Sequence, residues 1–321
     1  MSNILITSAG RRVSLVRAFK KELKQLIPNG KVYVTDFKPE LSAASQIADK
    51  EFRVYKIDDK NYINILLELC VKNNIKLIIP TLDSELLILA QNINKFKDSG
   101  ITIVISDEHF VNTCYNKIAT QDFFENSNIR VALVYNKTNF KLPLFIKPIN
   151  GSNSIDTTIV KYENQISKFH IENDELFFFE YIDSDIYDEF TCDLYYDKRG
   201  QLKCVIPRKR IEVRGGEISK GVTCNNRIKK IIEENFKTIK GARGCITMQF
   251  FMNNDEDVIG IEINARFGGG FPLSYLAGGN YPKWIIQEYL LNENIAYFDD
   301  WKTDLLMLRY DEEILVENYE N

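Results

Sequence analysis

The first hundred residues alternate short apolar runs with helical patterns, and this alternation constrains the fold more than any other feature of the sequence. Strands are expected at 3–8, 31–36, 77–80 and 101–105. Helical periodicity is found between them, at 13–26, 61–72 and 84–97. Because strands that alternate with helices form a parallel sheet covered by helices, we predict an N-terminal α/β domain with a doubly wound parallel sheet. Its ligand crevice is expected at the C-terminal ends of the strands.

Polar residues at the ends of these strands are the first candidate binding groups. Arg11 and Arg12 follow the first strand and begin a helix, where anions are favoured. Asp36 ends the second strand, but the Gly-x-Gly-x-x-Gly run of a dinucleotide site is absent, so NAD binding is disfavoured. Two questions stay open. Arg11 and Arg12 either bind an anion or are solvated. Asp83 is either a binding group or only a helix cap.

The composition excludes several classes of protein. The chain has 321 residues, enough for two or three domains, and its net charge of −4 argues against a general nucleic-acid binder. No apolar run approaches the roughly 18 residues of a membrane span, and the N-terminus leads directly into a strand, so we expect neither a span nor a signal peptide. The six cysteines show no Cys-x-x-Cys spacing, which favours buried thiols in a reducing cytoplasm. His109 and His170 are not at metal-ligand spacing from other ligands, so zinc sites and Cys–His catalysis are not expected.

The run 258–266 alternates apolar residues with polar ones, as a strand with one polar face does. Its partner is expected at 245–251, joined by a hairpin at 253–257, which sets Gln249 near Glu262. Carboxylate and amide oxygens suit Mg²⁺, and Arg266 on the same face suits phosphate. The alternative is a half-exposed hairpin with a solvated polar face.

The middle of the chain adds cationic and glycine-containing segments. A helix is expected at 108–126 with Lys117, and a strand at 142–149 ends near Lys147, before a Gly/Ser loop that lacks Walker spacing. Such a loop can offer backbone N–H groups to phosphates. The remaining expected elements are strands at 176–181 and 187–195, a mobile basic loop at 208–223, helices at 229–240 and 281–291, and an edge strand at 305–310.

Taken in this order, the segments resemble the ATP-grasp superfamily, and most of all single-unit proteins similar to the large chain of carbamoyl phosphate synthase. The resemblance covers essentially the whole chain. It implies a pre-ATP-grasp Rossmann-like domain at 1–107, a small ATP-grasp lobe at 108–181 and a large lobe with the metal site at 182–321. No second unit and no glutaminase are present in the sequence, so carbamoyl phosphate synthesis itself is doubtful.

The resemblance also implies the cofactors, ATP with Mg²⁺ (or Mn²⁺), and a role for each site residue. ATP phosphates are expected at Lys117 and Lys147, under the loop that contains Gly151, Ser152 and Ser154. Adenine is expected at the hinge formed by Glu180, Tyr181 and Ile182, and ribose at Glu189. The metal ligands are expected to be Gln249, Glu262 and Asn264, with either one or two ions bound.

The implied reaction is an ATP-dependent ligation. A small carboxylate is activated as an acyl-phosphate and captured by an amine, a thiol or a similar nucleophile. Arg266 is expected to face the transferred phosphate, and the acid is expected under the basic loop residues Arg208, Arg210, Arg214 and Lys220. Two alternatives are a nucleotide-binding partner subunit without its own chemistry and a kinase that releases a phosphorylated product. We expect a cytoplasmic protein without nucleic-acid or membrane partners, with homodimer formation through the N-terminal domain left open.

Overall fold

The computed structural model describes residues 2–149, 157–317 and 319. Its N-terminal sheet has five parallel strands in the order β3-β2-β1-β4-β5. The strands are β1 (Asn3–Ile6), β2 (Val32–Asp36), β3 (Lys50–Arg53), β4 (Ile75–Ile79) and β5 (Thr102–Ile103). The parallel sheet predicted from the sequence is therefore confirmed. Strand order reverses at β1, so the loops that follow β1 and β4 flank the crevice of this sheet.

Helices cover the sheet as predicted, and α1 buries Val16, Phe19 and Leu23 against it. The helices of this part are α1 (Val13–Leu26), η1 (Pro39–Leu41), α2 (Ala43–Ile47), α3 (Tyr62–Lys72), α4 (Asp83–Gln91) and α5 (Ile93–Asp98). The single helix predicted at 84–97 is wrong, because Asn92 ends α4 and begins α5, and its side-chain amide donates to the carbonyl of Ile88 at 2.8 Å.

A second predicted helix, at 108–126, is also divided in two. It consists of α6 (Glu108–Tyr115) and α7 (Lys117–Glu125), separated by Asn116 in an extended conformation. The Asn116 side chain accepts hydrogen bonds from two backbone amides of α7 and so caps this helix. The cap places Lys117 at the first position of α7.

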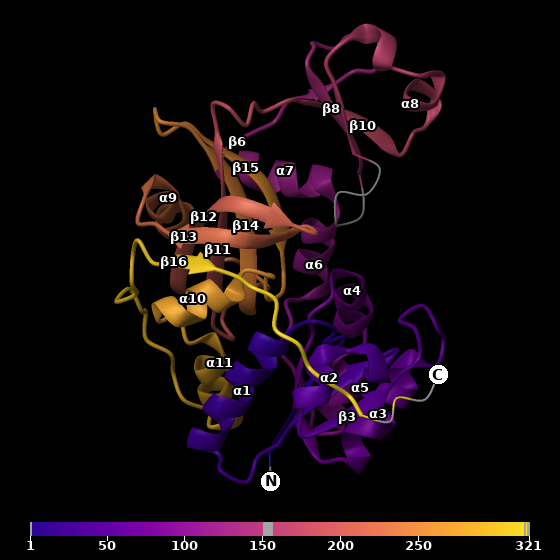
Figure 1. Ribbon diagram of the computed structural model, residues 1–321, viewed down its shortest axis with the longest axis vertical. Coiled ribbons are helices and arrows are strands. Elements are labelled where there is room, and N and C mark those ends of the chain that lie inside the picture. The colour runs from indigo at the N-terminus through magenta and orange to yellow at the C-terminus, as the bar shows by residue number, and fades with distance from the viewer. Residues whose placement is uncertain (1, 150–156, 318, 320–321) are drawn as a thin grey trace.

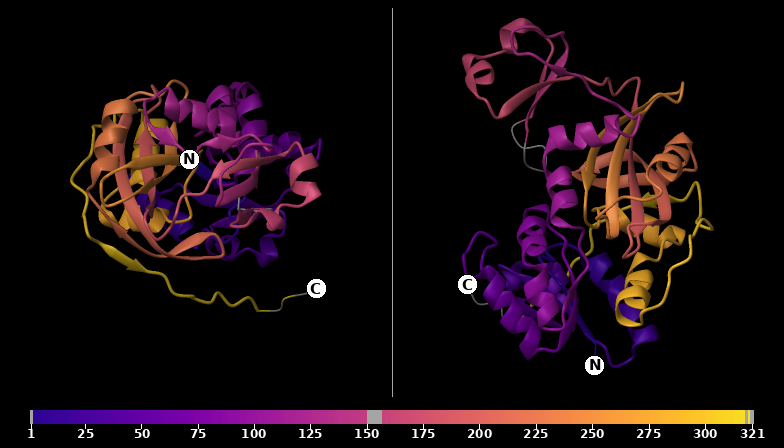
Figure 2. Two further views of the ribbon diagram at one scale, coloured as in Figure 1. Left: turned by 90° about the horizontal axis from the view of Figure 1, so that it is seen from above. Right: turned by 180° about the vertical axis from the view of Figure 1, so that it is seen from behind.

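A small antiparallel sheet forms a separate lobe at one end of the molecule (Figures 1 and 2). Its order is β7-β10-β8-β9, with β7 (Val134–Tyr135), β8 (Leu144–Pro148), β9 (Thr158–Val160) and β10 (Leu176–Glu180), together with η2 (Glu163–Gln165) and α8 (Lys168–Glu172). The lobe has its own apolar cluster, which includes Leu144, Ile146 and Phe178. Because this core is separate from the other two, the lobe meets the rest of the protein mainly at its ends.

The third sheet has seven strands in the order β16-β13-β12-β11-β14-β15-β6. Its strands are β6 (Arg130–Val131), β11 (Asp188–Tyr196), β12 (Leu202–Arg214), β13 (Glu217–Thr223), β14 (Gly244–Met252), β15 (Val258–Asn264) and β16 (Leu306–Leu308), and its helices are α9 (Arg227–Asn235), α10 (Phe271–Ala277) and α11 (Tyr281–Leu290). The predicted hairpin is confirmed, with Gln249 directly opposite Glu262. Gly260 allows α7 to approach β15 closely, since a Cβ there would lie 2.6 Å from the ring of Phe124.

The predicted mobile basic loop at 208–223 is wrong, because this segment forms the hairpin of β12 and β13 in the middle of the large sheet. The glycines that suggested a loop lie at its tip, where Gly215 and Gly216 both have positive φ. A continuous run of β12, residues 204–208, is buried, and the strand pairs on both sides, although Ile211 and Val213 nearer the tip are exposed. The glycine-containing sequence is therefore a tight turn between two strands.

One apolar cluster joins the N-terminal sheet to the large sheet. It contains Phe19 of α1 and Phe267 and Phe271 beside α10, and the rings of Phe19 and Phe267 meet edge to face with centroids 6.0 Å apart. In Figure 1, α1 lies against α11, and the extended C-terminal segment continues from β16 across the N-terminal domain. An ion pair between Arg17 and Glu312 (3.0 Å) holds this segment to α1. All six cysteines are free, and none of the described helices is long and apolar enough to cross a bilayer.

Candidate active site

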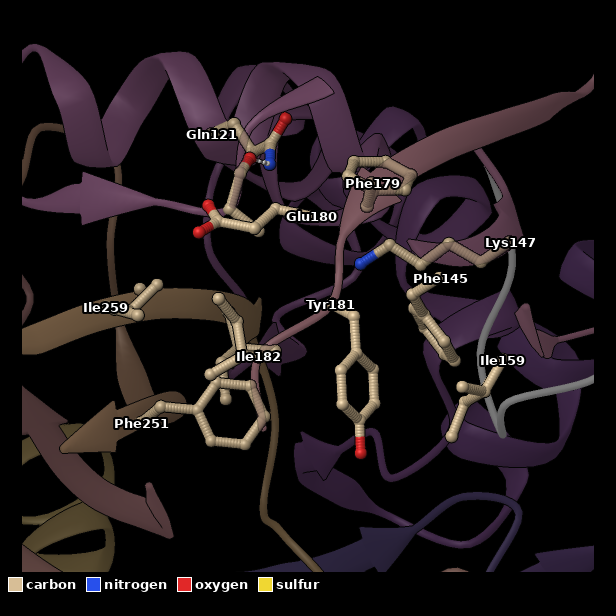
Figure 3. A pocket seen from close by; sticks show the side chains of 13 residues that line it. Gln121, Phe145, Lys147, Ile159, Phe179, Glu180, Tyr181, Ile182, Phe251 and Ile259 are labelled. Atoms are coloured by element: carbon tan, nitrogen blue, oxygen red, sulfur yellow. Dashed lines mark hydrogen bonds between the residues drawn. The ribbon is translucent and has the colours of Figure 1, made fainter. Parts of the chain in front are cut away.

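A pocket lies where the small sheet meets β15 of the large sheet, and it encloses about 670 Å³ including the space open to solvent (Figure 3). Its lining residues come from α7, both sheets and the segment that follows β10. They are Gln121, Ala132, Phe145, Lys147, Ile159, Phe179, Glu180, Tyr181, Ile182, Phe251, Ile259, Gly260 and Ile261. The walls are mainly apolar, as in pockets that bind a planar organic group.

The predicted hinge, at 180–182, forms one wall of this pocket. The Glu180 carboxylate accepts from the backbone amide of Leu133 at 3.1 Å and forms an ion pair of 2.9 Å with Arg130. The Glu180 carboxylate is therefore already occupied by interactions within the protein. Strand β10 ends at Glu180, and among the described residues the backbone amide of Ile182 makes no hydrogen bond. A ligand in the pocket would find main-chain groups of the hinge available.

Lys147 lines the pocket, and Lys117 and Glu262 lie close enough to influence its charge. In Figure 3 the Lys147 side chain extends into the pocket, and its Nζ lies 4.4 Å from the ring centre of Phe179. Burial lowers the pKa of Lys147 to about 8, while Glu262 acts to raise it and Lys117 lowers it further. Burial also lowers the pKa of Lys117, again against the effect of Glu262. The two ammonium groups and one carboxylate thus share a single electrostatic environment.

The three predicted metal ligands lie together on the polar face of β14 and β15. The side-chain amides of Gln249 and Asn264 both donate to Oε1 of Glu262, the latter at 2.9 Å. The described residues contain no cluster of three or more His, Cys, Asp or Glu that could hold a metal. The Glu262 carboxylate and the two amides nevertheless offer hard oxygen donors. Rotation of each side-chain amide would exchange its NH₂ group for its oxygen on the side that faces Glu262. The donor set therefore fits Mg²⁺ or Mn²⁺ in the company of further oxygens from an anionic ligand.

Arg266 is the next polar residue along this face, and a carboxylate from the N-terminal domain holds it. Its Nε donates to Oδ1 of Asp83 at 2.9 Å, and its Nη2 lies 2.5 Å from Oδ2. Leu82, and not Asp83, is the N-cap of α4, so the Asp83 side chain serves this ion pair. The paired carboxylate fixes the direction of the guanidinium in a bidentate arrangement.

The four residues predicted to close over an acid do not act together. Arg210 reaches the site, where its Nη1 lies 2.8 Å from Glu189 and 3.2 Å from Gln249. Arg214 and Lys220 are exposed and bind Asp311 and Glu212, respectively. Gly151, Ser152 and Ser154 lie outside the described residues.

Arg208 is the clearest correction, because it is almost completely buried in the large sheet. Its Nε donates to Oδ2 of Asp193 at 3.0 Å, and Ser274 donates to the same oxygen at 2.6 Å. A Cβ on Gly270 would lie 2.0 Å from Nη1 of Arg208, so the loop before α10 rests directly on the guanidinium. Arg208 therefore supports this loop and is not a mobile group.

The buried pair makes a strong prediction for stability. Asp193→Asn leaves the Arg208 charge buried without its counterion, so we expect a loss of about 3–5 kcal/mol in the free energy of unfolding, measured by urea denaturation. Asp188→Asn in the same strand is the control, since its pair with Lys209 is exposed and should contribute less than about 1 kcal/mol. Equal losses in the two variants would contradict the role assigned to the buried pair.

Comparison with known proteins identifies the fold. A family model described as the PylC-like N-terminal domain matches residues 4–104, and one described as ATP-grasp in the biosynthetic pathway with Ter operon matches residues 172–312. The chain belongs to the ATP-grasp superfamily. The predicted superfamily and fold are thus confirmed, whereas the closer similarity to carbamoyl phosphate synthase stays a prediction.

Solved structures share this ATP-grasp fold at low sequence identity. The biotin carboxylase domain of 2-oxoglutarate carboxylase from Hydrogenobacter thermophilus, crystallised as a dimer with MgADP, ADP and bicarbonate, has a TM-score of 0.71 and 15% identity over 94% of this chain and 73% of that one. L-amino acid ligase from Bacillus licheniformis has a TM-score of 0.68 and 14% identity over 90% and 74% of the two chains. Pyruvate carboxylase from Rhizobium etli has a TM-score of 0.72 and 13% identity over 95% of this chain, which spans only 30% of that protein's length. None of the curated proteins searched matches the chain.

Sequence reasoning left the role of Asp83 in this candidate site open and missed Gln121. Asp83 and Arg266 are 183 residues apart in the sequence, and no local pattern predicts that they form a pair. Gln121 lines the pocket from α7 and donates to the carbonyl of Ala132 at 2.8 Å. A helical residue of this type is otherwise read as surface.

Proposed function

We propose that this protein is an ATP-dependent ligase that activates a small carboxylate as an acyl-phosphate for attack by an amine or a similar nucleophile. The observation that carries the proposal is that Lys147 lines an apolar pocket, with Lys117 and Glu262 close enough to change its pKa. An apolar pocket suits a base, while two ammonium groups suit phosphates. The superfamily assignment supports the same function.

Adenine would lie in the apolar pocket against Tyr181, with main-chain groups of Glu180 and Ile182 as its hydrogen-bond partners. The three hinge residues line the pocket, and the backbone amide of Ile182 makes no hydrogen bond to the described residues. Glu189, on the same face of the sheet as Gln249 and Glu262, is the candidate partner for the ribose hydroxyls. Lys117 and Lys147 would bind the phosphates, together with the loop of Gly151, Ser152 and Ser154.

Gln249, Glu262 and Asn264 would hold one divalent ion, with phosphate oxygens completing its coordination. Such an ion, when bound, neutralises phosphate charge and stabilises the transferring phosphoryl group. Only one of the three protein ligands is a carboxylate, so a second ion would depend largely on oxygens of the nucleotide. Arg210 lies 3.2 Å from Gln249 and adds a positive charge beside this set.

In the proposed first step, a carboxylate oxygen of the acid attacks the terminal phosphorus of ATP, and the bond to ADP breaks. The nucleophile then attacks the acyl carbon, phosphate leaves and a proton passes to solvent. Phosphoryl transfer depends mainly on positioning and electrostatic stabilisation, which is consistent with a site lacking His and reactive Cys. Arg266, held by Asp83, would stabilise the negative charge of the transferred group.

The experiment that tests the proposal measures ADP release across amino acids and small carboxylates, with a panel of amines. A ligase gives ADP, free phosphate and a new amide in equal amounts. A kinase would leave phosphate on the substrate, and a partner subunit without chemistry would release no ADP in response to any acid.

Three broader predictions belong to the proposal. We propose domain boundaries near 107 and 181, which follow the three sheets except at β6, a strand of the 108–181 range that pairs with β15 of the large sheet. We propose a cytoplasmic location, supported by six free cysteines, most of them buried. Homodimer formation through the N-terminal domain is the assembly we propose, and the dimer of the Hydrogenobacter domain supports it.

The lowered pKa of Lys147 predicts a pH dependence of nucleotide binding. A phosphate favours the ammonium form, so the bound-state pKa lies above the free-state value of about 8. Between these values, binding takes up a proton, and the Kd for MgADP should rise up to tenfold per pH unit above about 8 while staying constant near pH 7. Lys147→Arg should flatten the profile, because a guanidinium stays charged. Calorimetry from pH 7 to 9.5 measures this, and a flat wild-type profile would contradict the assignment.

A further inference from the structure

A second pocket lies between the start of α1, the β12–β13 hairpin and the loop before α10. It encloses about 340 Å³ including the space open to solvent, and Phe267, Gly268 and Gly269 form one wall. These residues directly follow Arg266 in the chain. Figure 1 shows α1 and α10 packed side by side at this place. The pocket therefore opens next to the residue proposed to face the transferred phosphate.

The charged groups of this second pocket are unbalanced. Three guanidinium groups, those of Arg11, Arg12 and Arg309, line it together with one carboxylate, that of Glu217. Glu217 is already paired, since its Oε2 lies 3.0 Å from Nη1 of Arg309. Two positive charges consequently remain without a contacting carboxylate in the part of the chain that the structure describes.

The two arginines without a contacting carboxylate are held in different ways. Arg12 donates from Nη2 to the carbonyl of Thr81 at 3.0 Å, which is a neutral partner. Burial lowers the pKa of Arg12 to about 10 and the nearby charge of Arg266 lowers it further, while the charges of Glu217 and Asp83 act to raise it. The Arg11 side chain is exposed, lines the pocket and makes no hydrogen bond or ion pair with other described residues. One arginine is thus fixed at depth and the other is available at the rim.

We infer that this pocket binds the acid substrate, and that the acid carries a second anionic group, either a carboxylate or a phosphate, away from the carboxylate that reacts. The inference rests on the proposed function and extends it to a substrate class. The reacting carboxylate lies on the Arg266 side, and the distal anion is bound by Arg11 and Arg12. Leu15, Phe271 and Pro272 provide apolar walls for the short carbon chain between the two groups. A monoanionic acid would leave the two arginines unneutralised in a partly dry site.

The test compares acids that differ only in the distal charge. ADP release is measured with L-glutamate against L-glutamine, L-aspartate against L-asparagine, succinate against succinamate, and O-phospho-L-serine against L-serine. The dianionic member of at least one pair is expected to have a KM at least about tenfold lower. The first three pairs report a distal carboxylate, and the last reports a phosphate.

Variants then link the preference to the pocket. Arg11→Gln and Arg12→Gln are each expected to raise the KM of the preferred acid about tenfold or more, without changing the Kd for MgADP or the KM of the partner acid that lacks the distal charge. Arg11→Gln removes no hydrogen bond or ion pair made with the described residues, whereas Arg12→Gln removes the bond to Thr81, so the first variant guards against a folding defect in the second. Arg17→Gln, on the outer side of the same helix, is the matched control and should leave both constants unchanged.

Two results would overturn the inference while leaving the proposed function intact. They are equal KM values within every pair, and a preference for the dianion that persists in both pocket variants. If none of these acids releases ADP, each dianion is titrated by calorimetry into protein saturated with MgADP. Binding that Arg11→Gln weakens supports the inference, and no binding by any dianion overturns it. Failure of MgADP itself to bind would instead reject the proposed function, and the inference with it.

Discussion

Replacing Lys147 with alanine is expected to lower acid-dependent ADP release by about 10²- to 10³-fold, the loss seen when one preorganised donor to a developing negative charge is removed. The ammonium group is buried at the inner end of the nucleotide pocket, and its pKa is lowered to about 8. Because a buried charge is stabilised most by a ligand of opposite charge, the affinity for MgADP should fall together with the rate. Steady-state kinetics and calorimetry measure the two effects separately.

The control for this variant is Lys168→Ala, in the same lobe. Lys168 is exposed on α8 and forms a surface pair with Glu172 at 3.4 Å, so its loss should change neither constant. Thermal unfolding should also show that Lys147→Ala is folded, since it removes a desolvated charge from the free protein. Lys147→Ala with normal turnover would mean that the phosphates lie elsewhere.

Glu262→Gln is expected to have the second large effect. The substitution preserves the shape of the side chain but removes the carboxylate from the predicted metal set, leaving three amides. Acid-dependent ADP release should fall by about 10²-fold or more at the Mg²⁺ concentration that saturates the wild type, because the ion contributes several kcal/mol to the transition state. The Mg²⁺ concentration needed for half-maximal rate should rise, which distinguishes a lost ligand from a general loss of stability.

Glu256→Gln provides the matched control for this substitution. Glu256 lies in the turn of the same hairpin, and its exposed carboxylate lies 3.7 Å from Arg227. This variant should have the wild-type Mg²⁺ requirement. A normal Mg²⁺ requirement in Glu262→Gln would contradict the metal assignment, even if the overall rate were reduced.

Much of the fold could be predicted because local patterns decide it. The apolar runs of the first third specify the parallel sheet, and strict alternation at 258–266 specifies the register that sets Gln249 opposite Glu262. A one-residue shift in the register of this strand would turn Glu262 toward the core. The hydrophobic pattern therefore keeps Glu262 on the polar face. The order of the segments along the chain then indicated the superfamily, which the comparisons confirm.

The errors arose where residue type was a weaker signal than tertiary contact. The segment at 208–223 is rich in basic residues and glycine, and this composition concealed two strands of a central sheet. Arg208 is buried because Asp193 lies beside it on the neighbouring strand, a pairing that only the sheet register reveals. The helix breaks at Asn92 and Asn116 depend on how the side chains cap the flanking helices.

The second pocket is a further feature that depends on tertiary contacts and could not be predicted from the local sequence. Arg11 and Arg12 were ambiguous in the sequence, where solvated residues at a helix start are common. Their meaning depends on Phe267, Gly268 and Gly269, which lie more than 250 positions further along the chain. Only the packing of α1 against α10 brings these arginines next to Arg266.

The central claim is that nucleotide and divalent metal bind together in the cleft between the small sheet and the β14–β15 hairpin. The most direct test is a calorimetric titration of the wild-type protein with ADP, with and without Mg²⁺. We expect one nucleotide bound per chain, with an affinity that Mg²⁺ increases in the wild type but not in Glu262→Gln. No heat of binding and no thermal stabilisation by ADP with Mg²⁺ would contradict it.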